Sequence, residues 1–373
     1  MNIAVNTRLL LHNKLEGIGR FTFETLKRIT QNHPEHQFIF FFDRPWHEEF
    51  IFADNITPVA LFPQSRHPFL WYWWFEYAVP AALKKYKADV FISPDGYLSL
   101  STEVPQVPVI HDLNFEHYPA DIPYLYSKYY RHYFPQFAKK AKRIATVSEF
   151  SKKDISEKYG IELGKIDVVY NGCNESFKPV NDEMKKETQQ RFSHNCPYFL
   201  YVGAQHQRKN LQNLFRAFDE FKKEGSNHKL LVSGQKKWWT SEMEEAYSSM
   251  KHKDDVIFTG RLAEENLVTV MASAEALVYV SYFEGFGIPV VEAMRCNVPV
   301  ITSDTTSLPE IAGDAALLVN PFSVASISSA MSLIASDEML RNQLIQKGQE
   351  RSKQFTWDKT ADKLWQSVEK TLN

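Results

Sequence analysis

The chain has 373 residues, which is too long for one ordinary domain and sufficient for two domains that each bury a core. Hydrophobic residues make up 44% and charged residues 24%, so the composition is that of a globular protein and excludes a disordered or fibrous one. The 43 basic and 45 acidic side chains nearly balance, which argues against a dedicated nucleic-acid-binding protein because such a protein carries a basic excess.

Short apolar runs alternate with longer amphipathic stretches along the whole chain, which is the pattern of parallel α/β construction. The first half predicts strands at Ile3–Asn6, Phe38–Phe42, Val90–Ser93, Val107–His111, Ile144–Val147 and Val168–Tyr170. The second half predicts strands at Tyr198–Val202, Leu230–Val232, Val256–Phe258, Ala276–Val280, Val300–Thr302 and Leu317–Val319. We therefore expect the α/β fold class, with two Rossmann-like doubly wound domains facing one another across a cleft, because ligands of such sheets bind outside the carboxyl ends of the strands.

Two of the intervening stretches carry clear helix signals. Ser148–Tyr159 has a serine at its start and Gly160 just beyond its end, so it is well capped at both termini. Asn210–Glu224 gathers large apolar side chains on one face, as a helix packed on a sheet does. Both stretches fit the crossover helices of a parallel sheet.

The aromatic stretch Phe69–Tyr77 has two interpretations. At helical spacing one face gathers Leu70, Trp73, Trp74 and Tyr77, and we expect this face to belong to the core. The alternative is an acceptor platform or a membrane-facing patch, because Trp and Tyr suit the lipid interface. Basic residues that would assist at anionic headgroups follow at Lys84, Lys85 and Lys87 and later at Lys139, Lys140, Lys142 and Arg143.

The polar stretch Asn181–Asn195 separates the two series of strands, and we expect it to contain a linker and the first helix of the second domain. We expect an N-terminal, acceptor-side domain over residues 1–180 and a nucleotide-sugar-binding domain over residues 181–355. Residues 356–373 predict a closing amphipathic helix that packs back on the first domain.

Three cysteines, Cys173, Cys196 and Cys296, lie far apart with no CxxC pair. This pattern disfavours both a disulfide scaffold and a structural zinc site, and it fits a reducing compartment. The N-terminal MNIAVNTRLLLHNKL lacks a signal-peptide pattern, and no apolar run is long enough to cross a bilayer. We expect a cytoplasmic protein, with peripheral contact at the inner face of the cell membrane as an open alternative.

The densest group of candidate functional residues is Ser281–Met294, with the sequence SYFEGFGIPVVEAM. Gly285 and Gly287 permit a tight turn after a strand, and the following proline suits the first turn of a helix. The start of that helix is an anion site, flanked by Glu284 and Glu292, which are eight residues apart. Two such carboxylates can accept hydrogen bonds from the vicinal hydroxyls of a ribose or hexose. Alone they could be surface groups, but the turn, the proline and the Glu-Ala-Met ending favour a site.

SYFEGFGIPVVEAMRCNVPVITSDTTSLPEIAGDAALLVNP resembles the signature block of the retaining, nucleotide-sugar-dependent glycosyltransferases of family 4, with their E-x7-E motif. The resemblance extends over essentially the whole chain and is closest in style to bacterial mannosyltransferases. Further segments that carry it are Gly17-Ile18-Gly19-Arg20, Val109-Ile110-His111-Asp112-Leu113, Thr146-Val147-Ser148-Glu149-Phe150-Ser151, Tyr170-Asn171-Gly172, Val202-Gly203, Arg208-Lys209-Asn210 and Phe258-Thr259-Gly260-Arg261.

The resemblance implies the two-domain GT-B fold, an active site in the interdomain cleft, and transfer of a sugar with retention of anomeric configuration. It assigns Glu292 to the nucleotide ribose and Glu284 to the donor-sugar hydroxyls near the reacting carbon, in a catalytic role that need not be that of a nucleophile. A front-face route, in which the leaving phosphate helps to deprotonate the acceptor, is the usual proposal for such enzymes. The remaining donor-binding positions implied by the matching are Gly285, Phe286, Gly287, Ile288, Gly203, Gly260 and Arg261.

The resemblance also implies that no metal and no cofactor is required, and the sequence agrees because it has no Asp-x-Asp pair. Side chains and amides must then neutralise the departing diphosphate. Arg208 and Lys209, at a predicted helix start, suit that task, with Lys209 counted as catalytic. Ala204 stands where the family often has an arginine, which places more of the phosphate contact on Lys209 and makes Arg208 a donor-binding helper. The competing interpretation is a solvated helix start, where basic residues oppose the helix dipole.

His111 ends a predicted strand at the carboxyl edge of the first sheet, and the resemblance favours a catalytic role in binding a hydroxyl of the donor sugar. A structural histidine is the alternative. Gly17 and Gly19 are either an acceptor-side cleft loop or an ordinary strand-to-helix turn.

The function that follows is a retaining hexosyltransferase, with GDP-mannose as the first expected donor and a glycan or lipid-linked acceptor. A UDP-hexose donor remains open. A sugar-nucleotide epimerase would need an acid/base pair at C2 of the sugar, and none is evident beyond Glu284 and His111. A non-catalytic nucleotide-sugar-binding protein is the other class, and the intact set of Glu284, Glu292, Lys209 and His111 counts against it. A dehydrogenase is disfavoured because neither half opens with G-x-G-x-x-G after a strand.

Overall fold

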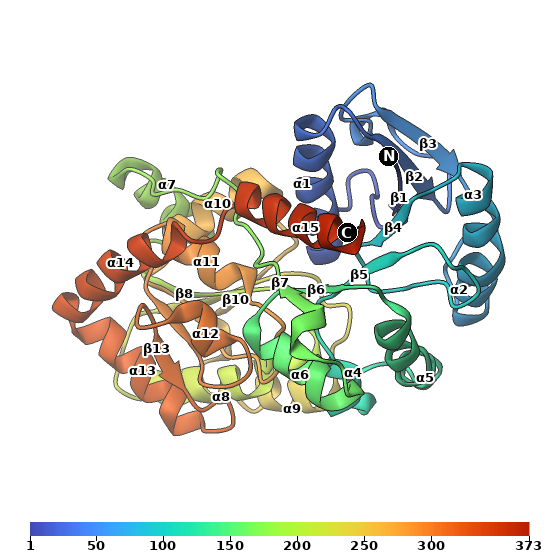
Figure 1. Ribbon diagram of the computed structural model, residues 1–373. Helices are drawn as coiled ribbons and strands as arrows, with labels where there is room; N and C mark the ends of the chain where they lie inside the picture. Colours follow the sequence, from blue (N-terminus) through green and yellow to red (C-terminus); the bar gives the residue numbers. More distant parts are fainter. Residues whose placement is uncertain (373) are drawn as a thin grey trace. The chain divides into compact units, whose positions relative to one another are not determined.

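The computed structural model describes residues 1–372, which form two compact units (Figure 1). The first unit comprises Met1–Gly172 together with the C-terminal segment from Thr356, and the second comprises Cys173–Phe355. Each unit is built on its own parallel sheet with helices. The α/β fold class predicted from the sequence is confirmed.

The first unit contains a seven-stranded sheet in the order β3-β2-β1-β4-β5-β6-β7, with every neighbouring pair parallel. Its strands are β1 (Asn2–Asn6), β2 (Gln37–Phe42), β3 (Ile56–Ala60), β4 (Val90–Ser93), β5 (Gln106–Ile110), β6 (Ile144–Thr146) and β7 (Ile166–Val168). The chain reverses its direction of travel across the sheet between β1 and β4, which is the topological switch point of a doubly wound fold.

The helices of the first unit are α1 (Gly17–Asn32), α2 (Pro68–Trp73), the π-helical segment η2 (Trp74–Ala78), α3 (Val79–Lys85), α4 (Asn114–His117), α5 (Tyr124–Lys140), α6 (Glu149–Tyr159) and α15 (Trp357–Leu372). Three short 3₁₀ turns are η1 (Glu48–Phe50), η3 (Pro119–Asp121) and η4 (Leu163–Lys165). Over residues 1–372, no helix combines the length and the apolar character that crossing a bilayer requires.

The second unit contains a six-stranded parallel sheet in the order β10-β9-β8-β11-β12-β13, with its switch point between β8 and β11. Its strands are β8 (Tyr198–Val202), β9 (Lys229–Ser233), β10 (Val256–Gly260), β11 (Ala276–Tyr279), β12 (Val300–Ser303) and β13 (Leu317–Val319). Its helices are α7 (Asp182–Ser193), η5 (Gln207–Lys209), α8 (Leu211–Lys222), α9 (Ser241–Ser248), η6 (Lys253–Asp255), α10 (Glu264–Ala272), α11 (Ile288–Arg295), α12 (Leu308–Ala312), α13 (Val324–Ser336) and α14 (Glu338–Ser352).

Burial explains why these segments form strands and helices. The central strands are buried along their whole length, as parallel strands covered on both faces are, and this is why they read as continuous apolar runs. The apolar stripe of α8 lies in the second core, with its large side chains Leu211, Leu214, Phe215, Phe218 and Phe221 all buried. In α6, Ser148 accepts the backbone N–H of Ser151 and Gly160 adopts φ 66°, so both predicted caps are present.

Most strands match the sequence prediction to within one or two residues at an end, and two strands differ more clearly. β3 was missed because ITPVA carries a proline, yet Pro58 is tolerated since β3 lies at the edge of the sheet. β7 covers Ile166–Val168 instead of Val168–Tyr170. It begins earlier because Ile144 pairs with Ile166 in the register of β6 with β7.

The boundary between the units falls after Gly172, not between residues 180 and 181 as the sequence analysis placed it. The segment that follows belongs with the second unit because Asn174 Nδ2 and Ser176 Oγ both donate to Glu264 Oε1, at 2.5 and 3.1 Å, and because Phe177 is buried. The polar stretch Asn181–Asn195 contains α7, the helix expected at the start of the second domain, whereas the expected linker lies beyond the boundary.

The C-terminal helix α15 lies beside α1 within the first unit (Figure 1). Thr360 Oγ1 donates to the carbonyl of Tyr170 at 2.7 Å, and Arg28 Nε pairs with Asp358 Oδ1 at 2.5 Å. The chain thus returns to the first sheet after completing the second one.

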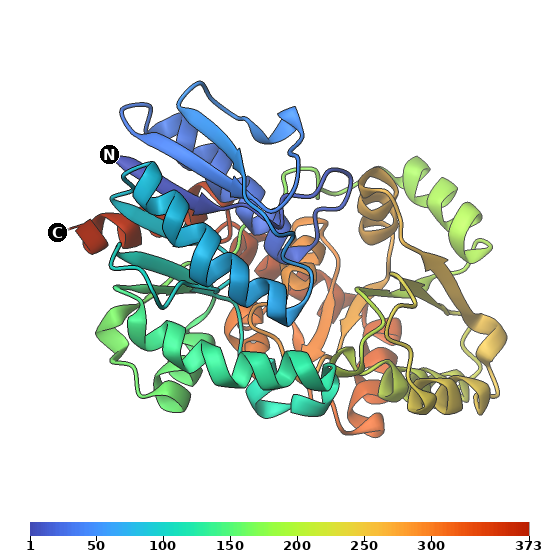
Figure 2. The same cartoon turned by 90° about the vertical axis from the view of Figure 1, so that its right-hand side faces the viewer.

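The aromatic stretch Phe69–Tyr77 does not form the single core face expected from regular helical spacing. α2, η2 and α3 run on as one continuous helix (Figure 2), but η2 is π-helical, and this changes which side chains share a face. Trp74 is fully buried, whereas Trp73 and Tyr77 are 55% and 53% exposed. The expectation that Trp73 and Tyr77 are core residues was therefore wrong.

Candidate active site

The candidate site in the second unit forms at the switch point of its sheet. β8 and β11 are hydrogen-bonded neighbours, so the loops that follow their carboxyl ends leave the sheet side by side. The loop after β8 leads through Gly203 to Arg208 and Lys209, and the loop after β11 carries Glu284. Parallel α/β sheets bind ligands at this position.

Glu284 is the centre of this group and is only 5% exposed. Its Oε2 accepts a hydrogen bond from Arg208 Nη1 at 2.7 Å. Its Oε1 accepts from Lys209 Nζ at 2.5 Å and from the hydroxyl of Tyr279 at 3.0 Å. Both carboxylate oxygens are therefore bound by cations of this chain.

The electrostatics follow from these contacts. Burial by itself would raise the pKa of Glu284, but the charges of Arg208 and Lys209 outweigh it and lower the pKa from 4.5 to about 2. The carboxylate is therefore ionised at neutral pH. For Tyr279, burial and then the adjacent charge of Glu284 raise the pKa well above its usual value, so the phenol stays protonated and donates.

Arg208 and Lys209 were predicted at a helix start, and they lie in the 3₁₀ turn η5 just ahead of α8. Asn210 separates the two elements and adopts φ 61°. Arg208 Nη1 also donates to the carbonyl of Phe283 at 2.9 Å, and the carbonyl of Arg208 accepts the N–H of Tyr282 at 3.0 Å. The interpretation of a solvated helix start does not hold, because both cations are tied to the loop that carries Glu284.

The start of α11 is shaped by Gly287, which has φ 99° and forms the N-cap. A Cβ atom on Gly287 would lie 2.6 Å from Leu308 Cδ2, so an alanine here would strain the backbone and displace the Leu308 side chain. Pro289 occupies the first turn, where its missing N–H costs nothing. The positive end of the α11 dipole therefore lies next to the loop of Glu284, as the motif predicted.

Three further side chains that contact Glu284 were not identified from the sequence. Tyr279 ends strand β11, where an aromatic residue is indistinguishable from a core residue in sequence, yet its hydroxyl contacts both Lys209 Nζ and Glu284. Thr306 Oγ1 accepts the backbone N–H of Glu284 at 3.2 Å, and Ser307 Oγ donates to the Glu284 carbonyl at 2.9 Å. The positive φ of Thr306, 58°, is a structural signal that no sequence pattern shows.

Glu292 lies half-buried on α11, in the same helix that Gly287 begins. Its charge, added to the larger effect of burial, raises the pKa of the Cys296 thiol to about 12 and raises that of Cys173 as well. Cys173 and Cys296 are both buried and both are free thiols, as structural cysteines are.

The remaining donor-binding positions predicted in this unit follow strand ends. Gly203 comes directly after β8, Gly260 ends β10 and Arg261 is exposed just beyond it. The carbonyl of Gly260 accepts the N–H of Gly234 at 2.9 Å, and the N–H of Gly203 donates to Ser233 at 2.9 Å, which links the ends of β8, β9 and β10. Gly285 and Phe286 are buried in the loop, and Ile288 is the first residue of α11.

Three predicted site residues belong to the first unit. His111 follows β5, and its Nε2 donates to the carbonyl of Pro94 at 2.8 Å, so the neutral ring presents a lone pair on Nδ1. Burial lowers the pKa of His111, which favours that neutral form. Gly17 is the first residue of α1 and Gly19 lies in its first turn.

Chemically, the group around Glu284 offers two cations, one ionised carboxylate and a helix start, which together suit a ligand that carries a diphosphate and hydroxyl groups. Among residues 1–372, the one group of side chains with metal-ligand spacing is His12, His47 and Glu49, and it includes none of the residues around Glu284.

Comparisons with known proteins agree with this geometry. Residues 15–177 match the model described as glycosyltransferase family 4, and residues 182–351 match the model described as glycosyl transferases group 1. The chain is 29% identical over 279 residues to the O-antigen chain mannosyltransferase B of Escherichia coli, covering 74% of this chain and 73% of that protein. It is 30% identical over 226 residues to the O-antigen chain mannosyltransferase RfbU of Salmonella typhimurium, covering 61% of this chain and 60% of that protein.

Among solved structures, the Anabaena protein Alr3699/HepE in complex with UDP-glucose superimposes with a TM-score of 0.77 at 15% identity. The superposition covers 99% of this chain and 100% of that one, so the two share a fold. The two family models together match nearly the whole chain, one on each unit. The chain therefore belongs to the glycosyltransferases, with a family 4 domain followed by a group 1 domain in a GT-B fold.

Proposed function

We propose that this protein is a retaining, metal-independent mannosyltransferase that moves mannose from GDP-mannose to a glycan or lipid-linked acceptor in the synthesis of a bacterial surface polysaccharide. The observation that carries the proposal is the pairing of Arg208 and Lys209 with Glu284 at the switch point of the second sheet. Two cations held beside a helix start are what a departing nucleoside diphosphate needs.

The diphosphate binds when Arg208 and Lys209 exchange hydrogen bonds to Glu284 for hydrogen bonds to phosphate oxygens. Arg208 and Lys209 neutralise Glu284 in the absence of ligand, so phosphate oxygens that arrive compete for cations that are already in position. Charge-assisted hydrogen bonds from Lys209 to the distal phosphate then stabilise the charge that develops as the sugar leaves. Glu292 accepts hydrogen bonds from the ribose hydroxyls, and Arg261 borders the nucleobase.

The transfer step uses the leaving phosphate as base. The bond between the anomeric carbon and the phosphate oxygen breaks, the acceptor oxygen bonds to the same face of that carbon, and the acceptor proton passes to the phosphate. Glu284 is not the nucleophile in this scheme, because the acceptor oxygen itself attacks the anomeric carbon. Its ionised carboxylate accepts hydrogen bonds from the sugar and holds the two cations in place.

We assign to His111 the binding of a donor-sugar hydroxyl. Its Nε2 proton is committed to the Pro94 carbonyl, so Nδ1 is an acceptor and a sugar hydroxyl is the matching donor. The lowered pKa keeps this acceptor available at neutral pH.

Support for the mannosyl donor and the polysaccharide acceptor comes from the O-antigen chain mannosyltransferases to which this chain is similar. The proposed absence of a metal requirement rests on the two cations and the start of α11, which supply the positive charge that a metal would otherwise provide.

The donor is tested by thermal shift with GDP, UDP and ADP, each with magnesium and with EDTA. A nucleotide at a hundred times its dissociation constant adds roughly 2.7 kcal/mol and raises the melting midpoint by several degrees. A shift with GDP that survives EDTA supports the proposal. A shift with UDP alone contradicts GDP-mannose as the donor and indicates a UDP-hexose donor instead. A shift that requires magnesium contradicts metal independence, and the anomeric configuration of the product, read by NMR, tests retention.

The site is tested by Lys209→Ala and Glu292→Ala, with Lys223→Ala as the control. Lys223 is an exposed lysine beyond the end of α8 that pairs only locally with Glu220. Loss of GDP affinity in Glu292→Ala and loss of turnover in Lys209→Ala are expected, with neither in the control. Unchanged kinetics in both site variants would refute the site.

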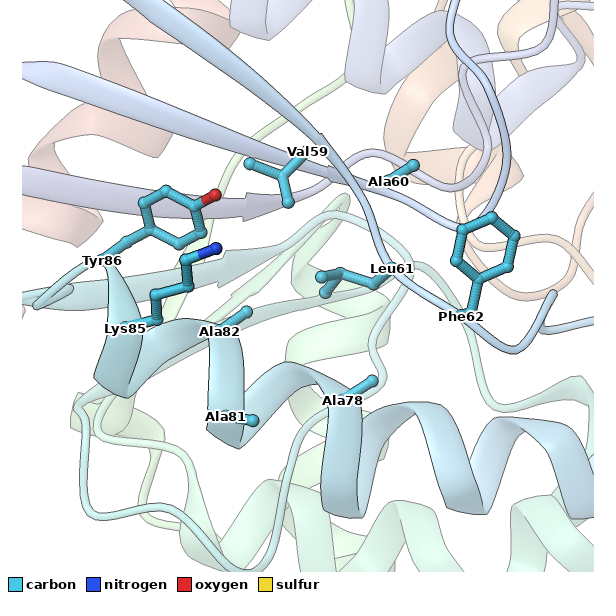
Figure 3. A pocket seen from close by; sticks show the side chains of 9 residues that line it. All are labelled: Val59, Ala60, Leu61, Phe62, Ala78, Ala81, Ala82, Lys85 and Tyr86. Atoms are coloured by element: carbon cyan, nitrogen blue, oxygen red, sulfur yellow. The ribbon is translucent and has the colours of Figure 1, made fainter.

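We also propose that the helical run α2-η2-α3 contacts the membrane surface that bears the acceptor. Its exposed aromatic face consists of Phe69, Tyr72, Trp73 and Tyr77, and Lys84 and Lys85 follow at its end. Beside it, a pocket of 290 Å³ lies between the alanines of this helix and the edge strand β3 (Figure 3). Val59, Leu61 and Phe62 line the opposite side, with Lys85 and Tyr86 at one end. Amphipathic aromatics beside lysines suit an anionic lipid interface.

Co-sedimentation with vesicles tests this contact. Binding to vesicles that contain phosphatidylglycerol, and its loss in Trp73→Ala/Tyr77→Ala, are expected. Phe322→Ala removes an exposed aromatic of the second unit and is the matched control, for which full binding is expected. Equal binding of the double variant and the wild-type protein would show that the aromatic face is not the contact.

A further inference from the structure

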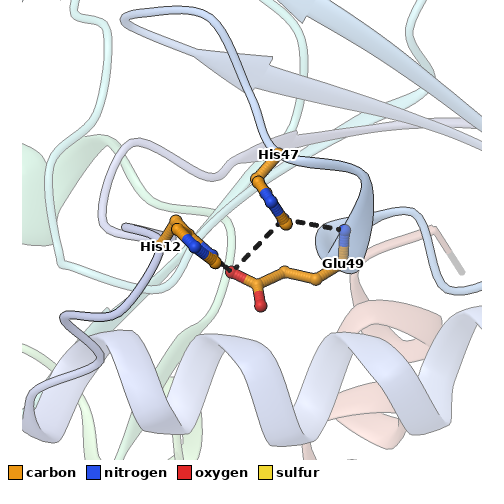
Figure 4. A group of neighbouring side chains, drawn as sticks. All are labelled: His12, His47 and Glu49. Atoms are coloured by element: carbon orange, nitrogen blue, oxygen red, sulfur yellow. Dashed lines mark hydrogen bonds and ion pairs between the residues drawn. The ribbon is translucent and has the colours of Figure 1, made fainter.

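Three side chains of the first unit that the glycosyltransferase site does not use lie close together: His12, His47 and Glu49 (Figure 4). His12 lies in the loop between β1 and α1, His47 follows β2, and Glu49 lies in η1. β1 and β2 are neighbouring parallel strands, so these loops leave the same edge of the sheet. The cluster therefore joins two separate loops at the carboxyl edge.

The distances suit shared ligation of one ion. His12 Nδ1 lies 2.6 Å from Glu49 Oε1, and His47 Nδ1 lies 3.7 Å from the same oxygen. One ligand atom from each residue lies within 4.8 Å of the other two. Ligand atoms that lie about 2.0–2.2 Å from a tetrahedral zinc ion are roughly 3.4 Å from one another, so His12 Nδ1 and Glu49 Oε1 must separate by about 0.8 Å to admit the ion.

The protonation pattern also suits a metal. His47 Nδ1 accepts the backbone N–H of Glu49 at 3.3 Å, so this nitrogen carries a lone pair. His12 Nδ1 and Glu49 Oε1 lie 2.6 Å apart, and since an ionised carboxylate only accepts, this hydrogen bond has Nδ1 as its donor. A metal ion at that point takes the place of the proton, which moves to the other ring nitrogen and leaves the imidazole neutral.

The two imidazole rings stack with centroids 3.8 Å apart and an interplanar angle of 16°. Parallel rings cannot both aim a nitrogen at one ion, so His12 or His47 must turn about its side-chain bonds. All three side chains are exposed to solvent, and such a rotation meets no core packing. Water completes the coordination sphere for the same reason.

We propose that His12, His47 and Glu49 form a binding site for a divalent transition-metal ion of the zinc class. Two imidazoles and one carboxylate favour zinc, nickel or cobalt, whereas magnesium prefers oxygen ligands alone. The bound ion ties the loop Thr7–Glu16 to the segment after β2. This loop leads directly into Gly17, so the metal restrains the start of α1.

This site is independent of the proposed transfer reaction. Its residues belong to the first unit, whereas Arg208, Lys209 and Glu284 belong to the second. Metal-independent turnover is therefore compatible with it, and its test does not require a donor or an acceptor.

Isothermal titration of the metal-stripped full-length protein with zinc chloride, and separately with magnesium chloride, tests the proposal. We expect one zinc equivalent that is lost in His12→Ala/His47→Ala and weakened at least tenfold in Glu49→Gln, with no magnesium binding at the same concentrations. His132→Ala removes an exposed histidine of α5 and is the matched control, for which unchanged zinc binding is expected. Because the exchanged side chains are exposed, unchanged melting midpoints confirm that the variants fold.

The isotherm of the double variant decides the outcome. If it matches that of the wild-type protein in stoichiometry and affinity, the bound zinc lies elsewhere and the proposal is overturned. Magnesium binding as tight as zinc binding would also overturn the proposal, because two imidazoles and one carboxylate should favour zinc over magnesium. Hydrogen exchange supplies a second readout: zinc should slow exchange over residues 7–16 in the wild-type protein and leave it unchanged in the double variant.

Discussion

The charged group around Glu284 has two roles: it stabilises the second unit, and in the proposed reaction it supports turnover. Replacing Lys209 with alanine tests both roles. Lys209 Nζ and Glu284 are largely buried, with side-chain exposures of 12% and 7%. Removing one partner of a buried ion pair costs about 3–5 kcal/mol because it leaves an uncompensated charge. Arg208 continues to pair with Glu284 Oε2, so we expect the lower end, about 3 kcal/mol.

This loss should appear as a fall of roughly 6–12 °C in the melting midpoint of the second unit, since about 2–4 °C corresponds to 1 kcal/mol in domains of its size. Turnover should fall as well, because the cation proposed for the departing phosphate is gone. Lys223→Ala removes only an exposed pair and should change stability by less than about 0.5 kcal/mol.

The double variant Lys209→Ala/Glu284→Gln shows whether the loss of stability arises from the unpaired carboxylate. Because the neutral amide carries no charge to compensate, the double variant should be more stable than the sum of the two single effects predicts, by at least about 1 kcal/mol. Turnover should stay low, since the missing cation is not restored. Strict additivity of the two substitutions, or a Lys209→Ala variant with wild-type stability and turnover, would refute the reasoning.

Three further predictions follow from the same site. Tyr279→Phe removes the hydroxyl that contacts Glu284 Oε1 and Lys209 Nζ, so it should lower the free energy of unfolding by about 1–3 kcal/mol and reduce turnover, as measured by denaturation and by initial rates. The pKa of Glu284 is lowered from 4.5 to about 2 on folding. Its contribution, about 3 kcal/mol, is therefore fully present above pH 4.5 and is lost as the pH falls towards 2. Melting midpoints of the wild-type protein and Glu284→Gln should accordingly converge at low pH, and a constant difference would contradict the assignment. Gly287→Ala should destabilise the second unit by at least about 1–3 kcal/mol, since Cβ would meet Leu308 and φ is 99°. Gly164→Ala is the control, because nothing lies close to the added Cβ, and it should leave the melting midpoint nearly unchanged. Equal melting midpoints for the two alanine variants would contradict the proposed backbone strain at Gly287.

Local sequence patterns predicted most of the secondary structure. Strands such as Val90–Ser93 and Tyr198–Val202 were predicted with their observed bounds, because burial on both faces of a parallel sheet requires an uninterrupted apolar run. The start of α11 was predicted for a similarly local reason, since glycine and proline act on their own backbone. Edge strand β3 was not predicted by the same reasoning, because an edge strand tolerates a proline that would argue against a central strand.

The aromatic run around Trp73 shows where local periodicity fails. A regular α-helix would place Trp73, Trp74 and Tyr77 on one face, but the π-helical segment alters the register and exposes two of the three. In this register Trp74 is fully buried, and its indole N–H donates to the carbonyl of Leu61 at 3.2 Å. A contact with a residue outside the helix cannot be read from the spacing within it.

The sequence by itself determined the α/β class, the position of the E-x7-E block and the residue types available for the reaction, because strand and helix preferences and motif spacing are local properties of the chain. Tertiary structure alone decided that Glu284 holds Arg208, Lys209 and Tyr279, residues up to 76 positions away. That association depends on β8 and β11 being neighbours across the switch point, since only then do the loops at their carboxyl ends meet.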